Sequence, residues 1–258
     1  MQVRTIECFA DPQLQNGTGT VVTVNDALQL VSSLPELTGL HFSGTSFPRD
    51  QTVQVARALV GATALTTLAM RIDSRQGCFV TDGFLEKLIS LRGLTRLEIL
   101  GGPLPLTDGG VQALGQMSSL MHLGITLPCT VTESGVQALC NLSALTHLEL
   151  SHSSNNTDNN IKALCGVSAL TRLDISDRRR FLERETAPRL TQEGIKALSS
   201  FSALTYLKAS FSPHLSDESL KGCMRSACSL PALTHLDLAG AWVKQGGHEP
   251  KISGGPRF

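Results

Sequence analysis

The sequence has no surplus of charge of either sign, because 22 aspartate and glutamate residues match its 22 lysine and arginine residues. Binding to nucleic acid or to an anionic membrane depends on a strong positive field, so this balance argues against both as partners. Long hydrophobic runs are also missing, since none approaches the roughly 18 apolar residues that a membrane span needs. The first residues lack the basic and apolar blocks of a secretory signal, and we expect a soluble, cytoplasmic protein.

Closely paired cysteines are absent as well. The seven cysteines are an odd number scattered along the chain, which is unlike a disulfide scaffold and indicates reduced thiols. The C-x-x-C and H-x-x-x-H spacings of structural zinc sites do not occur. We therefore predict no bound metal and no cofactor.

A repeated leucine pattern is what the sequence does contain. The motif L-x-x-L-x-apolar recurs at intervals of 25 to 34 residues, with a degenerate earlier copy around Ile6. Its starting positions are Leu37, Leu65, Leu94, Leu120, Leu145, Leu170, Leu204 and Leu233. The alternation of apolar positions predicts one short strand in each copy.

A second block precedes most copies of the motif. It is seen as TDGGVQALGQM at 107–117, TESGVQALCNL at 132–142 and TQEGIKALSSF at 191–201. Threonine is a favoured N-cap residue, an acidic or amide residue follows it, and the apolar positions then recur at helical spacing. Each block therefore predicts a short helix.

This combination resembles the leucine-rich repeat family, in particular its ribonuclease-inhibitor-like and cysteine-containing classes. The resemblance covers roughly residues 3 to 240, with one departure: where the family usually has Asn or Cys after the strand, only Cys129 fits well. It implies an α/β fold, a right-handed horseshoe solenoid with a parallel β-sheet on the concave face and short helices on the convex face. We expect a single domain over residues 1–258, with 239–258 as a C-terminal cap or tail.

Side chains alternate along a strand, so the residues between the buried leucines must face outward on the concave surface. The repeat aligns them in two rows, a mostly basic one and a mostly acidic one. The first reads Gly39, Thr67, Arg96, His122, His147, Arg172, Tyr206 and His235. The second reads His41, Ala69, Glu98, Gly124, Glu149, Asp174, Lys208 and Asp237.

Two interpretations of these rows remain open, a solvated face with mutually neutralising charges and a recognition surface. The adjoining carboxylates Glu149 and Asp174 favour the second, because like charges side by side predict a raised pKa on one of them. Acid–base chemistry on an open sheet lacks a pocket that excludes water, so we predict no catalytic residues. The candidate partner-binding residues are Arg71, Arg96, Glu98, His122, His147, Glu149, Arg172, Asp174, Tyr206, Lys208, His235 and Asp237.

The widest spacing between motifs contains an arginine-rich insertion at residues 176–190, which we interpret as a charge-balanced surface loop. For the whole chain we expect a non-catalytic protein–protein interaction module, present as a monomer or weak dimer. The alternative that the repeat type suggests is a substrate-recognition subunit of a ubiquitin ligase or a host-targeting effector module. No F-box or further domain is visible in these 258 residues.

Overall fold

The strands of the chain form one open, parallel sheet. The computed structural model describes residues 4–9, 29, 31–45, 52–72, 80–101, 104–128, 130–151, 158–176, 191–210 and 217–239. Nine strands lie in the sheet in chain order, and each pairs in parallel with the next. They are β1 Thr5–Phe9, β2 Gly39–Thr45, β3 Thr67–Ile72, β4 Arg96–Gly101, β5 His122–Thr126, β6 His147–Ser151, β7 Arg172–Ile175, β8 Tyr206–Ser210 and β9 His235–Ala239.

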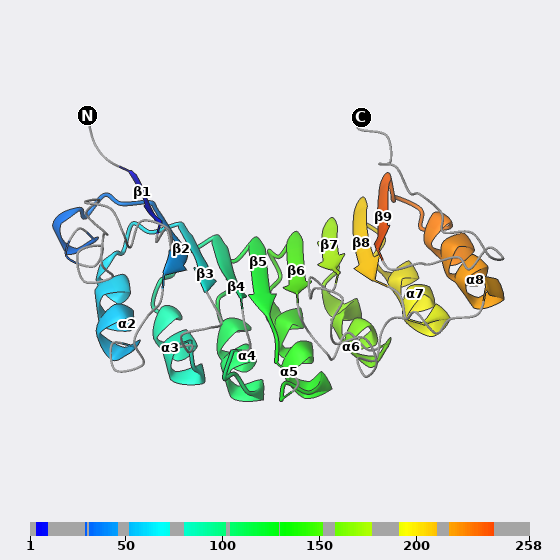
Figure 1. The fold of residues 1–258 in the computed structure, drawn as a ribbon, viewed down its shortest axis with the longest axis horizontal. Helices are drawn as coiled ribbons and strands as arrows, with labels where there is room; N and C mark the ends of the chain where they lie inside the picture. The colour runs from blue at the N-terminus through cyan, green and yellow to red at the C-terminus, as the bar shows by residue number, and fades with distance from the viewer. Residues whose placement is uncertain are drawn as a thin grey trace, which may run out of the picture.

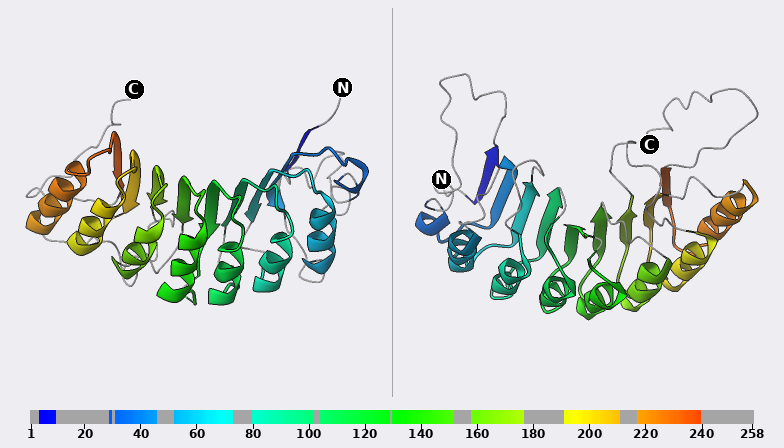
Figure 2. Two further views of the ribbon diagram at one scale, coloured as in Figure 1. Left: turned by 180° about the vertical axis from the view of Figure 1, so that it is seen from behind. Right: turned by 60° about the horizontal axis from the view of Figure 1, so that its bottom comes forward.

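A short helix follows most strands and lies behind the sheet. The sheet runs along the inner side of an arc and the helices line its outer side (Figure 1, Figure 2). The α-helices are α2 Thr52–Gly61, α3 Asp82–Leu88, α4 Asp108–Leu114, α5 Glu133–Ala138, α6 Asp158–Ala163, α7 Gln192–Ala197 and α8 Asp217–Cys228. A 3-10 turn extends three of them, as η4 Leu139–Asn141, η5 Leu164–Gly166 and η6 Leu198–Ser200.

The leucines of the motif fill the space between the sheet and the helices. Leu148 and Leu150 of β6, and Leu145 just before it, are at most 2% exposed, and they pack in one continuous core with Val136 and Leu139 of the preceding helical segment. Full burial of a leucine side chain contributes roughly 1.5–3 kcal/mol. Because each copy leaves one flank of its leucines uncovered, only stacking against the next copy completes the core.

The convex side repeats one hydrogen-bonding device from helix to helix. Thr107, Thr132 and Thr191 adopt extended backbone angles at the helix starts, and each hydroxyl accepts a hydrogen bond from an amide in the first helical turn. The preceding helix supplies an aspartate whose two oxygens accept hydrogen bonds from the amide and hydroxyl of that threonine. These pairs are Asp82 with Thr107, Asp108 with Thr132 and Asp158 with Thr191.

The aspartate–threonine hydrogen bonds explain the glycine in the helical block. A Cβ atom on Gly110 would lie 2.3 Å from Asp82 Oδ1, and one on Gly135 would lie 2.4 Å from Asp108 Oδ1. Real Cβ atoms essentially never come that close, so the aspartate of one repeat requires a residue without a side chain in the next.

A second repeated set of hydrogen bonds, the threonine ladder, connects the residues that directly precede the strands. Most of these residues are threonines. The Thr146 hydroxyl donates to the Met121 carbonyl at 3.0 Å, and the Thr171 hydroxyl donates to the Thr146 carbonyl at 3.0 Å. Equivalent hydroxyls donate in the same way from Thr38, Thr66, Thr95, Thr205 and Thr234. Met121 occupies this position in its own repeat and cannot donate, and its side chain is 49% exposed.

The predicted α/β solenoid is confirmed, with the sheet on the inner face and the helices on the outer face. The degenerate copy around Ile6 is the first strand. All but residue 176 of the 176–190 insertion, and all but residue 239 of the expected 239–258 cap, lie outside the described residues. No helix among the described residues is long and apolar enough to span a membrane.

Candidate functional site

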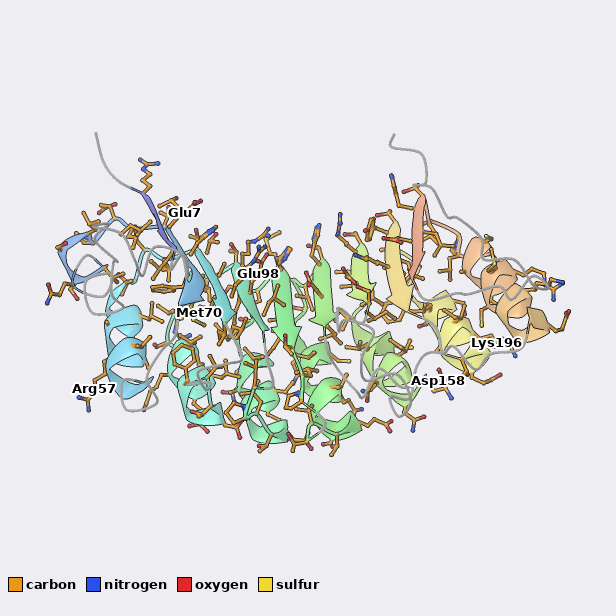
Figure 3. All side chains as sticks on the ribbon, in the orientation of Figure 1. Glu7, Arg57, Met70, Glu98, Asp158 and Lys196 are labelled. Carbon is orange, nitrogen blue, oxygen red and sulfur yellow. The ribbon has the colours of Figure 1, made fainter. Side chains whose placement is uncertain are left out.

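The two predicted rows exist on the concave face. Strand pairing places Arg96, His122, His147, Arg172, Tyr206 and His235 opposite one another in succession. Glu98, Gly124, Glu149, Asp174, Lys208 and Asp237 form the parallel row two residues further along. Figure 3 shows Glu7 and Glu98 on the sheet side and Arg57, Asp158 and Lys196 on the helix side, with Met70 between the layers. The structure therefore brings the candidate residues onto one surface.

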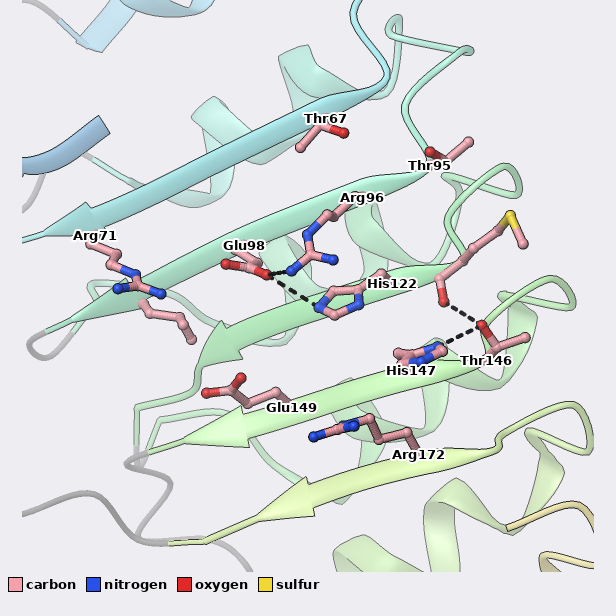
Figure 4. A pocket seen from close by; sticks show the side chains of 12 residues that line it. Thr67, Arg71, Thr95, Arg96, Glu98, His122, Thr146, His147, Glu149 and Arg172 are labelled. Carbon is pink, nitrogen blue, oxygen red and sulfur yellow. Dashed lines mark hydrogen bonds and ion pairs between the residues drawn. The ribbon is translucent and has the colours of Figure 1, made fainter. Parts of the chain in front are cut away.

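The middle of this surface is hollowed. A depression of about 710 Å³ spans β3 to β7 and is lined by Arg71, Arg96, Arg172 and nine other residues. Gly124 lies between Glu98 and Glu149 in the acidic row, and a Cβ atom on it would lie 3.3 Å from Glu98 Cγ, so its lack of a side chain accommodates Glu98. Figure 4 shows Arg71 and Arg172 on opposite sides of the depression, with Glu98, His122 and His147 between them. We call this depression the central hollow.

Glu98 is the electrostatic centre of the hollow. Its carboxylate forms an ion pair with Arg96 and accepts a hydrogen bond from His122 Nε2 at 3.2 Å (Figure 4). The side chain is only 10% exposed. The bond from His122 and the charge of Arg96 outweigh the cost of burial and lower the pKa of Glu98 to about 2. Glu98 is therefore a fixed negative charge that its neighbours largely neutralise.

His147 stacks beside His122, with ring centroids 5.4 Å apart and planes inclined by 20°. Its Nδ1 lies 2.9 Å from the Thr146 hydroxyl. A hydroxyl bound to an imidazole suggests an activated nucleophile, but the Thr146 hydroxyl already donates its proton to the Met121 carbonyl. His147 Nδ1 must therefore be the donor in this pair, and Thr146 is not activated. The same arrangement recurs at Thr234 and His235, as expected of a structural feature.

Arg172 is held in place by an aromatic ring. Its guanidinium carbon lies 3.7 Å from the centroid of the Tyr206 ring, and that ring stacks on His235 with centroids 6.2 Å apart. Stacking fixes the plane of the guanidinium and leaves its in-plane N–H groups able to donate. The basic row thus contains two stacks, His122 with His147 and Arg172 with Tyr206 and His235, and the second stack preorganises Arg172.

The acidic row is neutralised differently towards the C-terminal end. Lys208 Nζ lies 3.9 Å from carboxylate oxygens of both Asp174 and Asp237. Asp174 Oδ1 also accepts hydrogen bonds from the amide and hydroxyl of Ser176. Glu149 and Asp174 are adjacent as predicted, and a raised pKa on one of them stays a prediction. The large pKa shift in this row is that of Glu98, and it lowers the pKa instead of raising it.

Some contributors to the hollow were not predicted from the sequence. Gly124 shapes it by lacking a side chain, while Met121 and the threonines that precede the strands form part of its lining. The recurring threonine was a visible signal, whereas the ion pairing of Glu98 depends on distances between strands. No cluster of three or more His, Cys, Asp or Glu side chains suited to a metal ion occurs in the part of the chain that the structure describes.

Cys140, Cys165, Cys223 and Cys228 are free thiols. The Cys140 thiol donates to the Ala163 carbonyl at 2.9 Å, and burial raises the pKa of this thiol. A half-buried thiol with a raised pKa is a poor nucleophile. Cys140 therefore acts as a small structural residue between adjacent repeats.

No family model and no curated protein matches the sequence. Among solved structures, an internalin (inlF) of Listeria monocytogenes has a TM-score of 0.47 and 19% identity, over 81% of this chain and 56% of its own. Internalin C2 of the same organism has a TM-score of 0.37 and 18% identity, over 81% of this chain and 64% of its own. TLR13, from a complex with ssRNA13, has a TM-score of 0.45 and 16% identity, over 83% of this chain and 30% of its own.

The chain therefore spans less than two thirds of each of these three structures. Its own features carry the assignment of the fold. Eight copies of the leucine motif supply strands that pair in order, and the helical block of each repeat packs behind them. The ribonuclease-inhibitor-like class stays a prediction. By its repeat and its sheet, the chain is a leucine-rich-repeat solenoid.

Proposed function

We propose that the chain is a non-catalytic protein-interaction module that binds a protein partner on its concave face. The observation that carries the proposal is the central hollow, where polar and charged side chains converge from five strands on a rigid sheet. Stacking of repeats fixes the backbone on which these groups stand, so little conformational freedom is lost when a partner binds.

The chemistry of the hollow supports binding over catalysis. Its two histidines are engaged, His122 with Glu98 and His147 with Thr146. The hydroxyl nearest to an imidazole donates to a backbone carbonyl. Nucleophilic catalysis requires an activated nucleophile, which this hydroxyl is not, whereas recognition requires only fixed donors and acceptors. The expected monomeric or weakly dimeric state, without nucleic acid as partner, belongs to the same proposal.

The proposal is tested by affinity capture from native lysate with matched variants. In the concave variant, Arg96, His147, Glu149 and Arg172 are replaced together by alanine. In the control variant, four exposed charged residues of the helices are replaced in the same way, namely Arg57, Glu86, Lys87 and Lys162. Circular dichroism first verifies that both variants keep the native spectrum.

We expect the concave variant to lose the specific partner and the control variant to retain it. A direct binding measurement with the captured partner should show a loss of at least about tenfold in affinity for the concave variant alone. An unchanged set of captured proteins in the concave variant would overturn the proposed site.

A further inference from the structure

The central hollow has more positive than negative charge. Three arginines, Arg71, Arg96 and Arg172, line it together with the two glutamates Glu98 and Glu149. Arg96 and His122 neutralise Glu98, so the remaining charges are those of Arg71, Arg172 and Glu149. Among the described residues, no carboxylate lies within ion-pair distance of Arg71 or Arg172. The hollow can therefore accept additional negative charge.

Arg172 and His147 are the best prepared donors for an anion. They lie opposite each other on the adjacent strands β6 and β7, which are about 4.8 Å apart. Tyr206 fixes the guanidinium plane of Arg172, so its paired N–H groups are aligned for a carboxylate. Because His147 donates through Nδ1 to Thr146, its Nε2 is the nitrogen that can take up a proton.

Resting on the proposed function, we infer that the central hollow binds an acidic segment of the partner protein. One carboxylate is held between Arg172 and His147, and a second contacts Arg71. Binding transfers a proton from solvent to His147 Nε2, which then donates to the first carboxylate. Met121, 49% exposed on the lining of the same hollow, offers an apolar contact beside the acidic residues.

The spacing of charges favours an acidic peptide over a nucleic acid. Arg71 and Arg172 are four strands apart, about 19 Å across the sheet, and Arg71 also lies four residues, about 13 Å, further along its strand, so their backbones are about 23 Å apart. Glu98 and Glu149 lie on the strands between them. A nucleic acid strand carries one phosphate for about every 3.4 Å of helix axis, so phosphates would fall against these two carboxylates. An extended peptide of about seven residues spans the same distance and can place acidic side chains only at its ends.

The proton uptake follows from the surroundings of His147. The charged and titratable groups that face it are Arg96 on β4, His122 on β5, Glu149 on β6, and Arg172 and Asp174 on β7. Burial, followed by the nearby positive groups, lowers the pKa of His147 in the free chain. A bound carboxylate favours the protonated ring, so affinity should rise as the pH falls from about 7.5 to about 5.5.

The test uses an acetylated, amidated heptapeptide with glutamate at both ends and five glutamines between them, the diglutamate probe, with heptaglutamine as the neutral control. Calorimetry at low salt should show that the diglutamate probe binds at least about tenfold more tightly. Replacing Arg71 and Arg172 together by alanine should remove that difference. Arg172→Lys, which keeps the charge and loses the stacked fork, should weaken binding several-fold. Arg57→Ala is the matched control, because Arg57 is an exposed cation of α2 on the helix side, and its loss should change affinity less than about twofold (Figure 3).

Proton uptake is measured by calorimetry in buffers of different ionisation enthalpy. The unmodified chain should take up a fraction of a proton near neutral pH, and its affinity should rise several-fold towards pH 5.5. His147→Gln should bind the probe with little dependence on pH. Equal pH dependence in this variant would overturn the assignment of the proton to His147.

Failure of this inference is distinguishable from failure of the proposed function. Equal binding of the diglutamate probe and heptaglutamine overturns the acidic-segment inference, and tighter binding of an oligouridylate than of the diglutamate probe overturns it in favour of nucleic acid. In either case the proposed binding surface stands if the concave variant still loses the captured partner. Binding of the diglutamate probe together with unchanged capture in the concave variant would overturn the proposed function instead.

Discussion

The convex and concave sides of the repeats differ in what they keep constant. On the convex side the same aspartate–threonine bonds recur from α3 to α4, from α4 to α5 and from α6 to α7. On the concave side, equivalent positions carry arginine, histidine, histidine, arginine and tyrosine in turn from β4 to β8. Constant residues hold adjacent repeats together, whereas varied residues on a regular scaffold are available to a partner.

The largest expected effect lies on the convex side. Gly110→Ala would place a Cβ atom 2.3 Å from Asp82 Oδ1 and force this carboxylate away from Thr107. We expect the free energy of unfolding to fall by about 2–3 kcal/mol in urea denaturation. Gly109→Ala in the same helix is the control, since its Cβ atom would have only ordinary contacts, the nearest at 3.5 Å. Equal loss in both variants would refute the steric explanation.

The next effect concerns the contribution of Glu98, on the concave side, to the free energy of unfolding. The pKa of Glu98 is about 2 in the folded chain against an ordinary 4.5, so its ionised form stabilises the fold above about pH 4.5. That contribution is lost as the pH falls towards 2. Glu98→Gln should lower the free energy of unfolding by about 1–2 kcal/mol at neutral pH, with the difference shrinking in acid.

The matched control for Glu98 is Glu193→Gln. Glu193 forms an exposed ion pair with Lys196 at 3.0 Å, and such pairs contribute less than about 1 kcal/mol. Urea denaturation of both variants between neutral and acid pH compares the stability lost with a largely buried charge network and the stability lost with an exposed ion pair. A pH-independent difference for Glu98→Gln would contradict the assigned pKa.

A smaller loss is expected when one convex bond pair is removed. Asp108→Ala deletes the acceptor of both Thr132 bonds and should destabilise the chain by about 1 kcal/mol. Glu133→Ala is the control, because Glu133 holds the same position at the start of α5 and has no such bond among the described residues. Both variants lose a negative charge at a helix start, so the difference in their denaturation midpoints isolates the hydrogen bonds.

The smallest effect is a predicted gain in stability. Met121→Thr would supply the hydroxyl that its repeat lacks, donating to the Thr95 carbonyl as the other threonines do in their own repeats. We expect stabilisation of about 0.5–1 kcal/mol, measured by thermal unfolding. Thr171→Val, which removes an existing bond of the same ladder, should cost a similar amount. If Met121→Thr lowers the stability instead, the packing of the methionine side chain outweighs the added hydrogen bond.

Much of the fold was predictable because its causes are local in sequence. The leucine spacing indicates which face of each strand is buried, and the threonine followed by an acidic residue marks where each helix begins. Strand alternation then predicted that His147 and Glu149 share the concave face. The role of Gly124 was not predictable in this way, since a glycine inside a strand motif gives no sign that the Glu98 side chain of the adjacent strand lies against it.

The sequence by itself determined the repeat, the order of the strands and the membership of both concave rows, because the period fixes which residues become neighbours. Only the tertiary structure decided how those neighbours interact. The His122 ring reaches Glu98, the Thr146 hydroxyl is committed to a carbonyl, and Arg172 stacks on Tyr206. These choices depend on rotamers and on distances of a few ångströms between strands, which are set by packing across repeats that are 25 or more residues apart in sequence.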